Sequence, residues 1–309
     1  MMSASRKRQR REWSLLSRII RARGCYAMLA PFYILFFMFI ILPILGAAFL
    51  SFTDFNMLEI PAFVGLENYA RLFFDDDVFL IAANNTFIFA VITGPISYFA
   101  CLIFAWLINE LNPKLRAILT FVFYAPSISG MLFVMWGFIF SGDMYGYLNY
   151  FLMSLGFINQ PVQWLTNSET VLGVVIVVQI WMSLGTSFLS FIAGLQNVDR
   201  QLYEAAAVDG VRNRLQELLY VTLPSMGPQL LFGAVMQIGA AFSVSSICMT
   251  LAGFPSTDNA ALTIVTHIYD YGNVRFEMGY ACAVSMVLFV LILSVNHVIQ
   301  RIITRVADV

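Results

Sequence analysis

Six long intervals of this sequence contain no charged residue, and they limit the folds open to the chain more than any other feature. Asp, Glu, Lys and Arg are absent from residues 24–53, 78–109, 117–142, 170–198, 218–257 and 278–300. Each interval can hold a helix that crosses the hydrocarbon core of a bilayer, which takes about 20 mainly apolar residues. A charge at the centre of such a helix would cost about 2.5–3.5 kcal/mol. The spacing of the charges therefore predicts helices embedded in lipid.

The composition supports the same interpretation. Of the 309 residues, 60% are hydrophobic and 11% are charged, whereas soluble domains are about half apolar and about a quarter charged. We therefore expect an all-α integral membrane protein with six transmembrane helices. Their expected positions are 28–52, 86–108, 117–140, 171–194, 229–251 and 278–299.

A seventh charge-free interval, residues 144–168, is not expected to span the membrane. It contains glycines, a proline and several amide side chains, namely Asn149, Asn159, Gln160, Gln163 and Asn167. Lipid-exposed backbone cannot tolerate helix breaks of this kind. The interval therefore predicts an amphipathic or re-entrant segment at the membrane surface.

The distribution of basic residues predicts the orientation. With six spans and a cytoplasmic N-terminus, only Arg71 and Arg275 of the 17 Lys and Arg residues fall outside. Cytoplasmic loops normally carry the excess of Lys and Arg. A seventh span at 144–168 would place Arg200, Arg212 and Arg214 on the wrong side. We therefore expect both termini to be cytoplasmic.

These assignments divide the chain into three parts. They are a basic cytoplasmic tail over 1–27, a transmembrane domain over 28–305 and a short C-terminal end over 306–309. Basic residues beside a span are attracted to anionic lipid, so the tail is expected to anchor the topology. Binding of nucleic acid is a remote alternative for this tail, and we expect no nucleic-acid partner.

The first outer loop, residues 53–85, contains the run Asp75-Asp76-Asp77. Such a run could form a cation site, but nothing nearby supplies the spaced oxygen ligands of a calcium loop. We expect a solvated acidic turn instead.

The loop 195–228 is the longest cytoplasmic connection. Asp199 is suited to cap a helix and Gly210 to end one, which predicts a helix about 15 Å long between them. A second helical stretch is expected over 211–222, with Pro224 ending it. The alternative to a docking surface is a solvated hairpin whose apolar side chains pack on the protein itself. Those side chains are Leu202, Val208, Val211, Leu215 and Leu218.

This loop resembles the EAA motif in the membrane subunits of ATP-binding-cassette (ABC) importers: Glu-Ala-Ala, three residues, Gly and a hydrophobic-x-Leu-Pro ending. Here these are Glu204, Ala205, Ala206, Gly210 and Val221–Pro224. Ten residues separate Gly210 from Val221, one more than in the usual pattern. Over about residues 27 to 305, further fragments look like sugar permeases: Pro31-Phe32, Leu50–Asp54, Phe63–Tyr69, Asn85-Thr86 and Met278–Ala281.

The resemblance implies the type I ABC importer permease fold, in the plasma membrane of a prokaryote. Glu204, Ala205, Ala206, Asp209 and Gly210 would form a coupling helix seated on a dimer of cytoplasmic ATPase subunits. A second permease, giving a heterodimer, and an extracytoplasmic solute-binding protein would complete the complex. ATP and Mg would bind to the ATPase subunits. No cofactor is expected in this chain, which lacks a G-x-x-x-x-G-K-[S/T] phosphate-binding loop.

Polar side chains within the spans are the candidates for the translocation path, because lipid does not tolerate them unpaired. The candidates are Gln179, Trp181, Gln237 and Ser243. Amides, hydroxyls and an aromatic face suit a carbohydrate, while the alternative role is hydrogen bonding between packed helices. The resemblance implies a sugar as cargo, and the alternative cargoes are an amino acid, a polyamine or a glycerophosphodiester.

Two other classes of protein fit the sequence less well. An ion-coupled secondary transporter is expected to have carboxylates within its spans or internal repeats, and no expected span contains Asp or Glu. An enzyme is not expected either, because His267 and His297 have no cysteine or carboxylate at metal or nucleophile spacing. We expect structural roles for both histidines.

Overall fold

The computed structural model describes residues 23–307 as helices joined by loops. Within this range no strand forms, and the one β-type pairing is an isolated antiparallel bridge between Thr53 and Phe63. The predicted all-α class is therefore confirmed. Most of the predicted tail over 1–27 and the end of the predicted segment 306–309 lie outside the described residues.

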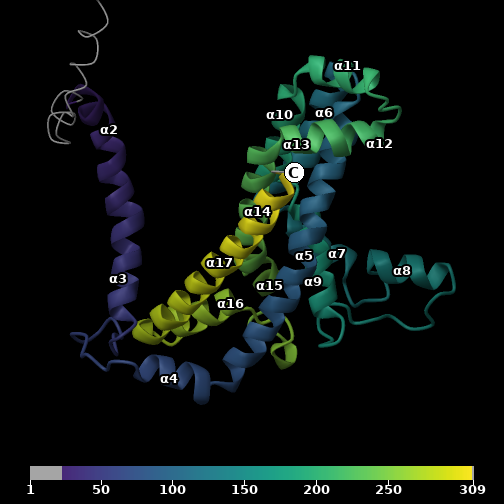
Figure 1. Ribbon diagram of the computed structural model, residues 1–309. Helices are drawn as coiled ribbons and strands as arrows, with labels where there is room; N and C mark the ends of the chain where they lie inside the picture. The colour runs from purple at the N-terminus through teal and green to yellow at the C-terminus, as the bar shows by residue number, and fades with distance from the viewer. Residues whose placement is uncertain (1–22, 308–309) are drawn as a thin grey trace, which may run out of the picture.

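Five helical segments of the described chain are long and apolar enough to cross a membrane, and they match five of the predicted spans (Figure 1). They are α2 and α3 (Arg23–Phe36 and Leu42–Leu50, joined through Phe37–Ile41), α5 (Asp77–Asn109), α9 and α10 (Val171–Met182 and Thr186–Asn197), α14 and α15 (Gly227–Phe242 and Ser246–Leu251) and α17 (Met278–Ala307).

The sixth predicted span, 117–140, is a bent pair rather than one helix. Helix α6 (Pro113–Ile128) and the segment Leu132–Ile139, which includes α7 (Met135–Ile139), meet at 83°. Between them Gly130 has a φ of +63°, a left-handed conformation that ends a helix. The position of the span is confirmed, but its continuity is not.

Helix α5 begins earlier than predicted, at Asp77, so the loop predicted over 53–85 ends at residue 76. The reason is an N-cap: the Asp76 side chain accepts a hydrogen bond from Phe79 N at 2.9 Å. An aspartate at this position satisfies backbone N–H groups that the first turn leaves free. Helix α5 therefore starts nine residues before the predicted span, which begins at 86.

The bundle is built around α5, which packs against α9, α10 and α14, while α14 also packs against α17. Buried aromatic rings fill these contacts, among them Phe89, Phe188 and Phe191. Gly233 of α14 lies so close to the Phe191 ring that a Cβ would overlap it, and a small residue there lets the helices approach. Segment α2–α3 stands apart in Figure 1, has no buried residue and contacts α17 through α3.

Two spans are interrupted, at Ser183–Gly185 and at Ser243–Ser245. Side chains from other helices and loops satisfy carbonyls in these breaks. In the first break, Gln237 Nε2 donates to Ser183 O at 3.1 Å. In the second break, Thr263 Oγ1 donates to Val244 O at 2.7 Å. Irregular backbone at membrane depth is tolerated where protein buries it in this way.

The segment 144–168 contains one short helix, α8 (Tyr147–Ser154), and no helix of spanning length. At about 1.5 Å per residue, α8 is much too short to cross a bilayer. The described segment therefore has no helix that could span the membrane, and its place at the membrane surface stays a prediction.

Candidate functional site

The loop 195–228 carries a short helix, α11 (Arg200–Val208), where the sequence predicts one. The Asp199 side chain caps it by accepting a hydrogen bond from Gln201 N at 3.0 Å. The helix ends before Gly210, whose φ of +97° is a left-handed conformation that favours glycine. Both predicted boundaries are confirmed.

Helix α11 presents the predicted contact residues on an open surface. It contains no buried residue. Ala206 is half-buried, and the other four predicted contact residues are exposed: Glu204, Ala205, Asp209 and Gly210. No ion pair within residues 23–307 engages Glu204. A carboxylate beside small side chains on a free helix surface can accept a hydrogen bond from a partner protein that approaches closely.

The alternative, that the apolar side chains of this loop pack on the protein itself, is wrong for three of them. Val208 is 87% exposed, and Leu202 and Leu215 are also exposed. Val211 and Leu218 are half-buried. The exposed side chains of Leu202 and Val208 add to the open surface of α11.

The second helix of this loop differs from the predicted stretch 211–222. It begins as α12 (Arg214–Glu217), capped by Asn213, and continues through a π-helical turn, Leu218–Thr222, into α13 (Leu223–Ser225). A π turn holds one residue more than an α turn, and it accommodates the extra residue before Val221. In this turn Leu223 N donates to Leu218 O, five residues earlier, so the α-helical hydrogen-bond pattern is already interrupted. Pro224, which has no N–H to donate, is tolerated at this interruption. Pro224 therefore lies within the helix and does not end it.

Side chains connect α11 to the segment that leads into α14. Tyr203 Oη lies 2.9 Å from Thr222 Oγ1, which donates to Glu217 O at 3.2 Å. Arg214 forms ion pairs with Glu217 at 2.8 Å and with Glu110, at the end of α5, at 3.6 Å. These side chains are partly exposed, so each ion pair contributes little by itself. The hydrogen bond of Tyr203 is the direct link between α11 and the π turn.

Gln237 is buried, at 5% exposed, and its side chain is engaged within the protein. The Nε2 atom donates to Ser183 O at 3.1 Å and lies 3.3 Å from Cys101 Sγ. Gln237 therefore joins α14 to the break between α9 and α10. This is the alternative role that the sequence leaves open, hydrogen bonding between packed helices.

The other three path candidates lie elsewhere on the same spans. Gln179 and Trp181 are half-buried on α9, and the Trp181 ring packs edge-on against Trp136, with 5.5 Å between centroids. Ser243 is exposed at the second break. Within residues 23–307, no hydrogen bond joins these three side chains to Gln237.

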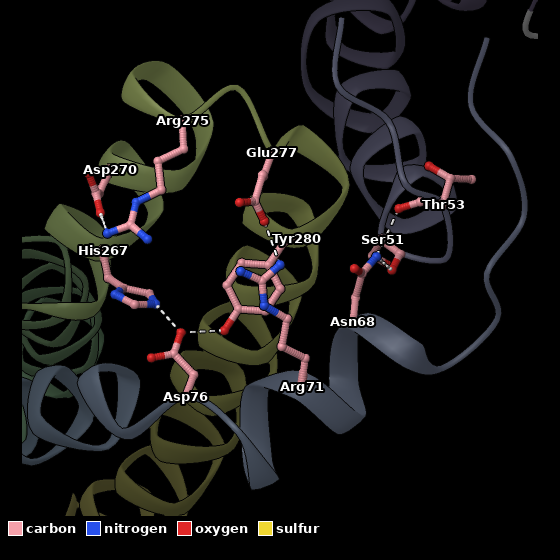
Figure 2. Close-up of polar contacts among 10 residues, drawn as sticks. All are labelled: Ser51, Thr53, Asn68, Arg71, Asp76, His267, Asp270, Arg275, Glu277 and Tyr280. Carbon is pink, nitrogen blue, oxygen red and sulfur yellow. Dashed lines mark hydrogen bonds and ion pairs between the residues drawn. The ribbon is translucent and has the colours of Figure 1, made fainter. Parts of the chain in front are cut away.

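A polar cluster that the sequence does not predict lies at the opposite end of the bundle from α11 (Figures 1 and 2). Asp76 is at its centre: Oδ2 accepts a hydrogen bond from Tyr280 Oη at 2.6 Å and lies 3.1 Å from His267 Nε2. His267 belongs to α16 (Ile264–Tyr269), and Tyr280 to the first turn of α17. Asp76 therefore connects the start of α5 to two other helices.

The expectation of a solvated acidic turn is wrong for Asp76, which is 9% exposed. It holds for Asp75 and Asp77, which are exposed. Residues 23–307 contain no group of three or more His, Cys, Asp or Glu side chains placed to hold a metal ion. The local sequence could not distinguish Asp76 from its neighbours, because its partners His267 and Tyr280 lie 191 and 204 positions away.

Arg71 and Arg275, the two basic residues that the sequence does not assign to the cytoplasmic side, belong to this cluster. Arg71 of α4 (Glu67–Phe74) forms an ion pair with Glu277, and its guanidinium lies 4.4 Å from the Tyr280 ring centroid. The Arg275 guanidinium lies 4.3 Å from the Tyr271 ring centroid. Contacts of this kind contribute about 0.5–1 kcal/mol at exposed sites. The contacts of Arg71 join α4 to the start of α17.

Three of the fragments that look like sugar permeases meet beside this cluster. Asn68 Nδ2 donates to Ser51 O at 2.9 Å and to Thr53 O at 2.8 Å, as Figure 2 shows. Gly279 N donates to Phe55 O at 2.9 Å, and a Cβ on Gly279 would overlap the Thr53 carbonyl. These fragments, read separately in the sequence, form one hydrogen-bonded junction between α3, α4 and α17.

The environment of the cluster lowers the pKa of both Asp76 and His267. Burial alone would raise the pKa of Asp76, but hydrogen bonds from Tyr280 and Phe79 N outweigh it and lower that pKa. Burial lowers the pKa of His267, and the nearby Asp76 carboxylate only partly opposes this. The imidazole is therefore neutral at physiological pH, and the carboxylate is charged.

The family model described as binding-protein-dependent transport system inner membrane component matches residues 102–307. The chain is 32% identical over 271 residues to the probable ABC transporter permease protein YesP of Bacillus subtilis, covering 86% of each. It is also 32% identical over 275 residues to the arabinooligosaccharides transport system permease protein AraP of the same organism, covering 88% of this chain and 85% of that protein.

One solved structure is similar to this chain over most of its length. It is the crystal structure of a bacterial alginate ABC transporter in complex with an alginate pentasaccharide-bound periplasmic protein. A chain of it superposes on this one with a TM-score of 0.74 and 26% sequence identity, covering 94% of this chain and 98% of that chain.

Proposed function

Because the chain belongs to the family of binding-protein-dependent transport system inner membrane components, we propose that it is the membrane-spanning permease subunit of an ATP-driven carbohydrate importer. The relatives support a saccharide cargo: one is a permease for arabinooligosaccharides, and one solved neighbour is an alginate transporter. The chain is a transport subunit and not an enzyme, and ATP hydrolysis belongs to separate subunits.

The observation that carries this proposal is the open surface of α11. Glu204 and the adjacent alanines lie on a helix without buried residues, held at one end by the Asp199 cap and at the other by Gly210. A short polar helix is not stable by itself, so its exposed surface is expected to pack against another protein. An ATPase subunit with a cationic or polar group facing Glu204 fits this surface.

The connections of α11 suggest how a push from that subunit reaches the membrane. Helix α10 leads into α11, and Tyr203 links α11 to the π turn before α14. Helices α10 and α14 pack closely where Gly233 meets Phe191. We expect them to move together as a rigid element, which converts nucleotide-driven motion into a change of access.

Within the spans, we propose that Gln179, Trp181 and Ser243 border the translocation path and that Gln237 positions it. Gln179 and Trp181 are half-buried and Ser243 is exposed, so their polar groups can receive sugar hydroxyls. The Gln237 amide is occupied by Ser183 O. Its role in the path is therefore to fix the break between α9 and α10.

We further propose the following assembly and orientation. The N- and C-termini are cytoplasmic, in the plasma membrane of a prokaryote. The partners are two ATPase subunits, which bind ATP and Mg, a second permease that forms a heterodimer with this chain, and an extracytoplasmic solute-binding protein. Family membership and the charge distribution of the loops support this arrangement.

Co-purification tests the proposal. In the full chain expressed with its ATPase, Glu204→Arg is expected to abolish recovery of the ATPase. The substitution places a cation against the cationic or polar group of the ATPase that is proposed to contact Glu204. Glu59→Arg, a charge reversal at an exposed site of the first outer loop, is the matched control and should leave recovery unchanged. Undiminished recovery with Glu204→Arg, in protein of normal thermal stability, would reject the docking surface.

Uptake tests the cargo. Cells expressing the complete transporter should accumulate a labelled oligosaccharide in an ATP-dependent manner, and the Glu204→Arg variant should not. Accumulation of a labelled amino acid or polyamine, with no oligosaccharide uptake, would contradict the assignment to carbohydrates and leave the docking surface intact.

A further inference from the structure

Residues 144–157 form an arm that extends away from the helical bundle (Figure 1). The arm contains α8, which packs against α7, and it lies in the half of the bundle away from α11. Its aromatic side chains are unusually exposed: Tyr145 at 84%, Tyr147 at 73%, Tyr150 at 66%, Phe151 at 57% and Phe157 at 75%. A helix that faced water on this side would carry polar residues instead.

The exposed rings lie on one face of α8. Tyr147, Tyr150 and Phe151 follow the i, i+3, i+4 spacing that aligns side chains along a helix. Asn149 between them is fully buried, and Leu148 is half-buried. The helix therefore has its polar anchor inside and an aromatic stripe outside, the reverse of a solvated surface helix.

Hydrogen bonds hold the arm in place, so the aromatic stripe stays exposed. The Asn149 amide nitrogen donates to the carbonyls of Ser141, Asp143 and Val162, at 3.1–3.2 Å. Its Oδ1 accepts from Val162 N at 3.1 Å and from Trp164 Nε1 at 2.8 Å. A buried amide with all of its hydrogen-bonding groups engaged fixes the loop around it.

We propose that this aromatic arm lies in the headgroup layer of the bilayer and sets the depth of the bundle in the membrane. No charged residue occurs from 144 to 168, so no charge in the arm opposes transfer out of water. Tyrosine rings, with an apolar body and a polar hydroxyl, are enriched at the membrane interface. Helix α7, against which α8 packs, also has exposed apolar side chains, with Met135 and Phe138 at 60% and 68%.

The choice of lipid as the occupant follows from these features together. The arm is too short to cross the bilayer, it is apolar but rich in hydroxyl groups, and it packs against α7, whose apolar side chains are exposed. A short amphipathic helix of this kind lies in the plane of the interface. The inference is independent of the cargo and of the ATPase; only the leaflet depends on the orientation proposed above, which makes it the outer one.

Spin-label accessibility tests the arm in the assembled transporter, reconstituted in vesicles of phosphatidylethanolamine and phosphatidylglycerol. A nitroxide is attached through Tyr150→Cys or Phe151→Cys, in a background with Cys25→Ala and Cys282→Ala. Its collisions with oxygen, which concentrates in lipid, are compared with its collisions with a water-soluble nickel chelate. Asp75→Cys, at an exposed acidic site, is the control that should favour the nickel chelate.

Oxygen should prevail at both arm positions, at a depth just below the phosphates. If the nickel chelate prevails there as it does at position 75, the arm lies in water and the proposal is wrong. If both reagents are excluded, a protein surface such as the second permease covers the stripe, and the proposal is equally wrong. Both labelled positions are exposed, so the substitutions remove no packing contact from the core.

Discussion

His267 Nε2 lies 3.1 Å from Asp76 Oδ2, although 191 positions separate the two residues in the sequence. The same carboxylate oxygen accepts the hydroxyl of Tyr280. The contact joins the N-terminus of α5 to α16 and to the start of α17, three elements that enclose the end of the bundle opposite α11. A single buried carboxylate thus holds together segments that the connectivity of the chain leaves free to separate.

Asp76→Asn should destabilise the protein, because a neutral amide replaces the carboxylate that receives Tyr280 and faces His267. Hydrogen bonds to a charged group contribute about 1.5–3 kcal/mol each. We expect a lower thermal midpoint in detergent, measured by the loss of monodisperse protein on heating. Asp75→Asn alters an exposed neighbour and should change stability by less than about 0.5 kcal/mol. Equal midpoints for the two variants would contradict the central role of Asp76.

Acidification should destabilise this cluster. Since burial lowers the pKa of His267, the unfolded chain, with a histidine pKa of about 6.5, binds a proton that the folded chain resists. Stability is therefore full above about pH 6.5 and declines below it. The lowered pKa of Asp76 has the same sign but acts below about pH 3.9, the usual range of aspartate.

The measurement for this prediction is the thermal midpoint as a function of pH between about 5 and 8, the range in which an ordinary histidine titrates. The decline near pH 6 should be weaker in His267→Gln and unchanged in His297→Gln, since His297 is exposed on α17. A decline that is identical in the His267→Gln variant would assign it to other groups.

Gly279→Ala should be strongly destabilising, because the new methyl group would overlap the Thr53 carbonyl, which is backbone and cannot rotate away. Overpacking of this kind costs about 1–3 kcal/mol. Gly173→Ala on α9 is the matched control, since no atom lies within 4 Å of the position of its Cβ. Thermal midpoints of both variants in detergent distinguish a tight junction from a general cost of substitution. A Gly279→Ala protein as stable as the control would show that the junction can open without penalty.

Tyr203→Phe should reduce coupling more than stability. It removes one hydrogen bond, to Thr222, worth about 0.5–1.5 kcal/mol, and leaves the ring in place. In vesicles holding the assembled transporter, we expect less solute moved per ATP hydrolysed. Tyr220→Phe, at an exposed tyrosine of the same segment, is the control. An unchanged ratio of transport to hydrolysis in Tyr203→Phe would mean that motion passes to α14 by another route.

Gln237→Leu should lower stability, whereas Gln179→Ala and Trp181→Ala should lower apparent affinity for the solute. The leucine removes the amide donor to Ser183 O in a buried break and leaves only the weak thiol donor of Cys101, at a cost of about 1–3 kcal/mol. The half-buried Gln179 and Trp181 are expected to affect the path instead. Thermal midpoint and concentration dependence of uptake separate the two effects. Unchanged solute affinity in both alanine variants would remove Gln179 and Trp181 from the path.

The sequence by itself determined the positions of the spans and of α11. Charge-free intervals place helices in lipid because a charge in the hydrocarbon core is costly. Asp199 and Gly210 set the ends of α11 because capping and left-handed termination depend only on local residues. These are local effects, and they act within a few residues of their cause.

Only the tertiary structure decided which polar residues are buried and where the spans break. Asp76 differs from Asp75 and Asp77 because α16 and α17 bring His267 and Tyr280 to it. The break after α9 persists because Gln237, from another helix, satisfies Ser183 O. Both outcomes depend on which helices become neighbours, since a buried polar group is stable only beside its partner. That information lies in contacts between distant residues, where the local pattern carries no signal.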